Sequence, residues 1–183
     1  MSAPAPVLPP VRRLAHPGPP DPVRIRGMAA PRARHVRLLL QPGSTLFEAL
    51  VRPLAAAGIR HASVSLQAGG FRAVRYCVGG PDPTGRTAAC YSAPRNAGPV
   101  LLLSGNATLG LGLDGQPLVH CHAAFADASG AVRGGHLLTG ECWIGDAPVP
   151  VLATALDGFG LHQVHDAETN MPLFQPRRAP TDG

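Results

Sequence analysis

The sequence contains no lysine, no Cys-x-x-Cys pair and no long apolar run. A helix that crosses a bilayer needs about 20 consecutive apolar residues, so the sequence predicts no membrane-spanning helix. The first ten residues also lack the continuous apolar core of a signal peptide. Without a secretory signal, four widely spaced cysteines are weak evidence for disulfides. These absences predict a soluble, cytoplasmic protein with reduced thiols and no membrane partner.

Aromatic residues are scarce too, at 4% of the chain, which is too few for a base-stacking platform. No helix-turn-helix pattern is recognisable. The net charge of +5 is unevenly distributed: residues 1–37 hold seven arginines and one acid, whereas residues 38–176 hold seven arginines and nine acids. A nucleic-acid-binding domain usually carries its basic patch on the folded body. The acidic body therefore argues against direct, sequence-specific DNA recognition.

Proline and glycine are abundant, with 21 and 22 residues, while 45% of the chain is hydrophobic. This composition indicates one good-sized core with irregular extensions. We expect a disordered Pro/Arg-rich arm over residues 1–33, one domain over residues 34–176, and a disordered tail over residues 177–183. Four arginines cluster near the end of the arm, and these could contact phosphate or simply be solvated: Arg24, Arg26, Arg32 and Arg34.

A strand over residues 35–40 and then a helix open the predicted domain. Thr45 and Glu48 have capping-box spacing, and leucines at 46, 50 and 54 share one helical face. Gly58 is the expected stop. Pro53 lies inside this pattern, so it should kink the helix or end its regular part.

Short strands follow for most of the remaining chain, because apolar residues alternate or cluster between turn signals. One helix followed by many strands predicts an α+β fold with a central, mainly antiparallel sheet and one principal helix. Residues 161–174 should add one short strand and an ordered loop. The other expected strands are 62–68, 71–78, 87–92, 99–103, 107–113, 118–126, 132–138, 141–144 and 149–156.

Three histidines gather in the strand pair 118–138. His120 and His122 share one strand face, roughly 6.6 Å apart along the axis, and the polar turn 127–130 leads back to His136. A plain four-residue loop would place His136 opposite Cys121, on the wrong face. An odd loop length or a bulge at Gly134-Gly135 would place it beside the other two. A three-histidine site therefore predicts an irregularity in this hairpin.

Three neutral imidazoles can bind zinc or another divalent metal, with nitrogen–metal distances of about 2.0–2.1 Å and a fourth position open. The alternative is two polar histidines on a solvated strand face, with no ion. Cys121 points to the other face and is expected in the core. Glu141 is the nearest acid downstream, but no spacing argument assigns it a role.

The same stretch resembles the PPC domain family, the plant and prokaryote conserved domain. The resemblance covers about residues 34–156. The motifs that carry it follow the family's order: Ser104-Gly105-Asn106, Gly115-Gln116-Pro117, His120-Cys121-His122, Asp127-Ala128-Ser129-Gly130 and Gly134-Gly135-His136-Leu137. The resemblance implies an α+β domain that assembles as a homotrimer. It also implies a metal site at the three histidines in some members.

Plant members of this family join the domain to AT-hooks and act in nuclear DNA binding, whereas the biochemical role of prokaryotic members is largely unsettled. This chain lacks the Arg-Gly-Arg-Pro core of an AT-hook. Three functions stay open at this point. They are an oligomeric binding or regulatory module associated with DNA or a DNA-bound protein, a metal-dependent enzyme or small-ligand binder, and a structural assembly protein.

Overall fold

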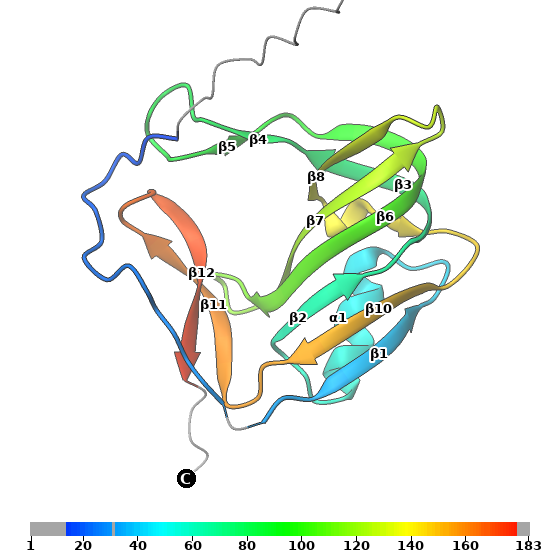
Figure 1. The fold of residues 1–183 in the computed structure, drawn as a ribbon, viewed down its shortest axis with the longest axis horizontal. Coiled ribbons are helices and arrows are strands. Elements are labelled where there is room, and N and C mark those ends of the chain that lie inside the picture. The colour runs from blue at the N-terminus through cyan, green and yellow to red at the C-terminus, as the bar shows by residue number, and fades with distance from the viewer. Residues whose placement is uncertain (1–13, 31, 179–183) are drawn as a thin grey trace, which may run out of the picture.

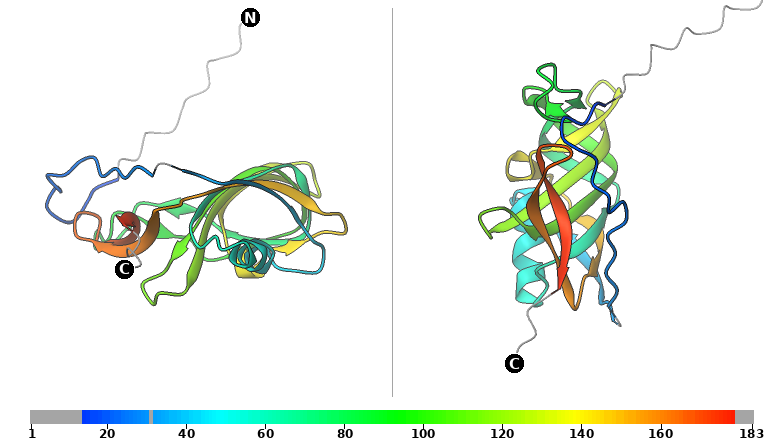
Figure 2. Two further views of the ribbon diagram at one scale, coloured as in Figure 1. Left: turned by 90° about the horizontal axis from the view of Figure 1, so that it is seen from below. Right: turned by 90° about the vertical axis from the view of Figure 1, so that its left-hand side faces the viewer.

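A strongly curved sheet dominates the described part of the protein, and the one α-helix found there packs beneath the sheet (Figure 1, and Figure 2, left). The computed structural model describes residues 14–30 and 32–178, so expectations for residues 1–13, 31 and 179–183 lie outside it. In chain order the elements are β1 (His35–Leu40), α1 (Leu46–Ala56), β2 (Ala62–Leu66), β3 (Gly69–Cys77), β4 (Gly79–Gly80), β5 (Cys90–Tyr91), β6 (Arg95–Leu111), β7 (Pro117–Asp127), β8 (Val132–Leu137), a 3₁₀ turn η1 (Thr139–Glu141), β9 (Trp143–Ile144), β10 (Val149–Ala155), β11 (Phe159–Asp166) and β12 (Met171–Arg178).

The main sheet runs in the order β1-β10-β2-β6-β7-β8-β3-β9. Neighbouring strands in this order pair antiparallel. Within the described residues, one pairing is parallel, between β11 and β6. The expected mainly antiparallel sheet with one helix is therefore confirmed. Within the described parts of the chain, no helix combines the length and apolar composition needed to cross a bilayer.

Helix α1 begins as its sequence predicts. The Thr45 hydroxyl accepts from the Glu48 amide at 3.2 Å, and the Glu48 carboxylate accepts from the Thr45 amide at 3.1 Å. Pro53 does not end the helix, which continues to Ala56. Pro53 costs the helix one amide hydrogen bond, but Leu54, which follows it, is buried in the core and holds the last turn in place. Gly58, at φ +67°, follows the helix as expected.

The core fills the space between α1 and the inner face of the sheet. Leu46, Leu50 and Leu54 of the helix are each at most 1% exposed. From β7, Phe125 is fully buried and meets the ring of Tyr76 edge to face, with centroids 5.1 Å apart. Burying such large side chains supplies most of the driving force for folding.

The outer face of the sheet carries a continuous row of opposed residues. The register aligns Leu152 of β10 with Ser65 of β2, Ser65 with Asn106 of β6, and Asn106 with His122 of β7. His122 in turn lies opposite His136 of β8. The histidines therefore belong to the face that points away from α1.

Strand β6 is longer than expected. The residues Ser104-Gly105-Asn106 were predicted to separate two strands, but one strand continues from Arg95 to Leu111. A bulge between Leu102 and Ser104 explains the difference. The extra residue changes which face the following side chains occupy, so the apolar pattern shifts phase without the strand ending.

Two other expected strands are mostly absent. Of residues 87–92, only Cys90–Tyr91 pair, with Gly79–Gly80, because Asp82 organises the preceding loop. Of residues 141–144, Glu141 belongs to η1 and Trp143–Ile144 alone form a strand.

The chain ends in a hairpin, β11–β12, where one strand and a loop had been expected. Strand β12 runs to Arg178, two residues into the predicted tail. Residues 14–30 form no helix or strand but lie along this hairpin (Figure 1). The Gly18 amide donates to the Glu168 carbonyl at 3.0 Å, and Arg24 and His16 both contact the Glu168 carboxylate. The division of the chain at residue 33 stays a prediction.

His61 connects this hairpin to the body of the protein. Its Nδ1 accepts from the Leu161 amide at 3.2 Å, and its ring stacks on His162 with centroids 5.3 Å apart. Burial, followed by the nearby His162 and Arg60, lowers the pKa of His61 below its ordinary value. An exposed histidine has a pKa of about 6.5. His61 therefore binds protons more readily when the hairpin has moved away from it than when the two are in contact. The stabilising contact is therefore fully present above that value and weakens as the pH falls through the lowered pKa.

We expect the hairpin to open more often at acid pH. Hydrogen exchange of residues 159–166, corrected for intrinsic rates, should show lower protection at pH 5.5 than at pH 7.5. His61→Gln retains an acceptor without titrating, so the difference should shrink in that variant. An unchanged pH dependence in His61→Gln would assign the effect to another group.

Candidate metal centre

The β7–β8 hairpin turns through three residues, 128–130. Asp127 and Ala131 close the loop with a 3.0 Å hydrogen bond from the Asp127 amide to the Ala131 carbonyl. The Asp127 carboxylate accepts from the amides of Ser129 and Ala131 at 3.0 and 3.1 Å, and from Arg133 at 2.7 Å. The hydrogen bonds from the Ser129 hydroxyl and from Arg133, followed by those from the two amides, lower the pKa of Asp127 to about 2. Gly130, at φ +81°, supplies the left-handed residue that a three-residue hairpin loop requires.

The odd loop length sets the register of the histidines. Asp127 faces Ala131, and the ladder continues regularly until His122 faces His136. The predicted irregularity is therefore present, in the turn rather than at Gly134-Gly135. Cys121 points to the opposite face and is fully buried, as expected.

Gly134 and Gly135 have a different role from the predicted bulge: they allow backbone to approach closely. A Cβ on Gly135 would lie 2.4 Å from the Cys77 carbonyl oxygen, and one on Gly134 would lie 2.9 Å from the Ala123 carbonyl oxygen. Strand β8 is thus held tightly between β7 and β3. This packing fixes the backbone on which His136 stands.

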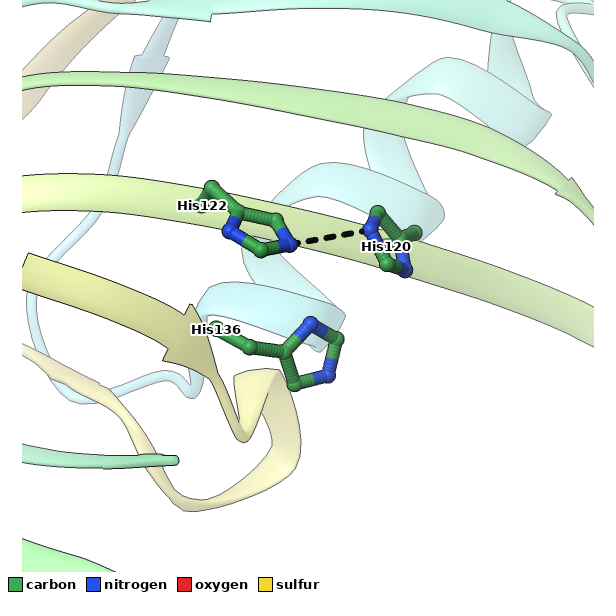
Figure 3. Close-up of side chains that lie close together, drawn as sticks. All are labelled: His120, His122 and His136. Carbon is green, nitrogen blue, oxygen red and sulfur yellow. Dashed lines mark hydrogen bonds between the residues drawn. The ribbon is translucent and has the colours of Figure 1, made fainter. Parts of the chain in front are cut away.

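The three imidazoles converge on one region of the outer face (Figure 3). His120 and His122 extend from β7 and His136 from β8, and one ligand nitrogen from each lies within 4.8 Å of the others. The Nε2 atoms of His120 and His122 are 3.1 Å apart. The ring centroids of all three pairs are 4.8–5.2 Å apart.

Burial and proximity favour the neutral forms of His120 and His136. Burial, followed by His120 and His122, lowers the pKa of His136 to about 4. Burial and the neighbouring His122 also lower the pKa of His120. Since a metal binds only the unprotonated ring, these shifts favour metal binding by His120 and His136.

The donor set fits a divalent metal ion. Ligands at about 2.0–2.1 Å in a tetrahedral site lie about 3.3 Å from one another, close to the 3.1 Å between the two Nε2 atoms of β7. His136 must approach slightly, because the largest separation within the group is 4.8 Å. Imidazole nitrogens suit zinc and several other transition metals. Such an ion would retain an open coordination position.

Tyr91 is a neighbour of the site that the sequence did not indicate. Its ring stacks on His136 with centroids 4.6 Å apart, and its hydroxyl lies 3.4 Å from His136 Nδ1. Burial, followed by Cys77, raises the pKa of Tyr91. The residue is separated from His136 by 45 positions, so no local pattern could have placed it there.

The other candidate residues lie elsewhere. Glu141 forms an ion pair with Arg75. Arg24 binds Glu168, Arg26 binds Asp21, and Arg34 binds Asp157. These three arginines therefore already have carboxylate partners, while Arg32 is exposed.

Comparison with solved structures finds the same fold in several prokaryotic proteins. A metal-containing protein of Archaeoglobus fulgidus is 21% identical, with a TM-score of 0.62 over 84% of this chain and 99% of that one. A plant- and prokaryote-conserved (PPC) protein of Pyrococcus horikoshii is 22% identical, with a TM-score of 0.60 over 82% and 96%. A "putative DNA-binding protein" of Ralstonia eutropha JMP134 is 18% identical, with a TM-score of 0.59 over 76% and 89%.

Sequence comparison identifies the family. No curated protein matches the chain closely. The family model of the Plants and Prokaryotes Conserved (PCC) domain, however, matches residues 28–155. This segment is more than half of the chain and includes all three histidines. The resemblance found in the sequence motifs is thereby confirmed, and the chain belongs to the PCC, or PPC, domain family.

Proposed function

We propose that this protein is an oligomeric PPC-type binding or regulatory domain that holds a divalent metal ion, zinc being the best fit, on His120, His122 and His136. The observation that carries the proposal is the convergence of three ligand nitrogens within 4.8 Å. The lowered pKa of His136 supports it, because the ring is ready to bind at neutral pH. The metal-containing relative of A. fulgidus supports it as well.

His122→Ala is expected to abolish stoichiometric metal binding. Protein purified without a polyhistidine tag and incubated with zinc should contain about one ion per chain by elemental analysis. Losing a hydrogen-bond partner of a metal ligand typically costs about 10–100-fold in metal affinity, so removal of the ligand itself should cost at least about 100-fold. His35→Ala is a matched control, because His35 is an exposed histidine of strand β1 bound to Thr154. A wild-type chain that remains free of metal after zinc incubation would contradict the proposal.

The outer face of the sheet supports the homotrimer that the family resemblance implies. Three large apolar side chains on this face are about half exposed: Leu39 of β1, Leu101 of β6 and Leu152 of β10. Exposed apolar patches often mark protein–protein contacts. Light scattering of the full chain should give three times the chain mass of 18.9 kDa. Leu152→Arg should lower that mass, and a wild-type monomer would contradict the assembly.

Association with DNA is the second candidate, and the R. eutropha relative, named a "putative DNA-binding protein", favours it. The contact would involve Arg24, Arg26, Arg32 and Arg34, but three of these are already paired with carboxylates. To bind DNA, each of these three arginines would have to leave its carboxylate partner and contact a phosphate instead. DNA binding that persists after deletion of residues 1–33 would contradict a contact made by Arg24, Arg26 and Arg32. A metal-dependent enzyme or small-ligand binder is the alternative use of the histidine site.

A further inference from the structure

A cavity of about 270 Å³ opens beside the histidine centre. His122 forms part of its wall, and Tyr91, another wall residue, stacks on His136. The cavity therefore adjoins the region on which the three imidazoles converge. Its lining contains no arginine, aspartate or glutamate and consists largely of small or apolar residues, among them Leu14, Gly79, Gly80 and Met171.

Two of the walls come from outside the segment that matches the family, residues 28–155. Leu14 precedes that segment and Met171 follows it, at the start of β12. Hydrogen bonds hold the tip of the β11–β12 hairpin against the loop that leads to Tyr91. The Asn170 side chain donates to the Arg86 carbonyl at 2.7 Å, and the Ala88 amide donates to the Thr169 carbonyl at 2.9 Å.

The loop itself is fixed from within. The Asp82 carboxylate accepts from the amides of Thr84 and Thr87 at 2.9 Å each. On the other side, the contacts of His16 and Gly18 with Glu168 hold the residues that follow Leu14. The cavity is thus built from four separate parts of the chain, each held by hydrogen bonds.

We propose that this cavity is the ligand pocket of the histidine centre, and that it binds a small molecule with a short apolar body and a single anionic, metal-binding group such as a carboxylate. The inference rests on the proposed metal site. Three neutral imidazoles leave the charge of a divalent ion uncompensated and one position open, which favours an anionic donor. The uncharged walls leave no partner for a second charged group on the ligand. Ligand pockets for larger molecules usually have 300–1,000 Å³, so the body must be short.

Cobalt substitution of the full chain provides the test, because the visible spectrum of bound Co²⁺ changes when a new ligand enters its coordination sphere. Acetate, butanoate and hexanoate serve as probes that differ only in apolar length. Each methylene buried should tighten binding by up to about fourfold, so hexanoate should bind at least tenfold more tightly than acetate. The double variant Leu14→Ala/Met171→Ala should reduce this difference, because it weakens hexanoate binding more than acetate binding.

Leu113→Ala is the matched control, since Leu113 is an exposed leucine in the turn between β6 and β7, away from the cavity. It should retain the full dependence on chain length. Equal affinity for all three acids at a stoichiometric cobalt centre would overturn the pocket and leave the metal site intact. A chain that binds no cobalt would overturn both the metal site and the pocket. The same chain-length dependence in the double variant and the wild type would overturn the assignment of the walls.

Discussion

Phe125→Ala is expected to lower the free energy of unfolding by about 3–5 kcal/mol. Phe125 is 0% exposed and stands on β7, near the middle of the main sheet. Its ring lies edge to face with Tyr76, an arrangement worth about 0.5–1.5 kcal/mol beyond the burial of area. Removing the ring leaves a cavity. Because β7 is paired with β6 on one side and β8 on the other, the sheet cannot shift to fill this cavity. Urea denaturation followed by circular dichroism measures the change.

Phe125→Leu is the matched control for this substitution. Leucine retains most of the apolar volume, so the loss should stay below about 1.5 kcal/mol. Phe125 and His122 occupy opposite faces of β7, so the folded fraction of Phe125→Ala should bind metal as the wild type does. A loss below 1 kcal/mol in Phe125→Ala would mean that the core around β7 relaxes to close the cavity.

The main elements of the fold could be predicted because their signals are local. Helix α1 follows from the spacing of Thr45 and Glu48 and from the three buried leucines. Strand β2 follows from strict alternation, with Ala62, Val64 and Leu66 buried. In both cases the residues that decide the structure lie close together in the sequence, within a single helix or a single strand.

Other parts depend on distant partners, and no local pattern contains them. The bulge at Leu102 in β6 exists because β7 pairs continuously on both sides of it. The β11–β12 hairpin was expected to be one strand and a loop. Its residues include Pro172 and Pro176, which do not favour a strand. The hairpin remains a strand pair because Pro172 and Pro176 lie on β12, which pairs only with β11 within the described residues.

The histidine site shows the same division between local and distant information. Two histidines two residues apart predict a shared face, and the turn 127–130 predicts a hairpin. The sequence did not decide whether the loop has three or four residues, and hence on which face His136 lies. The hydrogen bonds of Asp127 and the left-handed Gly130 settle that question. Tyr91 and the cavity beside His122 depend on contacts between distant segments, so only the structure reveals them.

Gly135→Ala is expected to weaken metal binding by at least tenfold and to lower the free energy of unfolding by about 1–3 kcal/mol. The added Cβ would lie 2.4 Å from the Cys77 carbonyl oxygen, which belongs to the backbone of β3 and cannot rotate away. Strand β8 must then move from β3, where His136 pairs with Cys77. Because β8 lies between β7 and β3, this movement changes the position of His136 relative to His120 and His122. Zinc affinity by competition with a chelator and urea denaturation measure the two effects.

Gly70→Ala separates the effect of this contact from the effect of losing a glycine in a strand. Gly70 lies in β3, and a Cβ there would meet nothing within 4 Å. This control should leave both stability and zinc affinity near the wild-type values. A Gly135→Ala protein that is less stable but binds zinc normally would show that His136 is not a ligand. The site would then consist of the two histidines of β7. Phe125→Ala should lower the stability without changing the zinc affinity, whereas Gly135→Ala should lower both. Comparing the two variants therefore tests whether zinc affinity depends on the position of His136 or on the stability of the core.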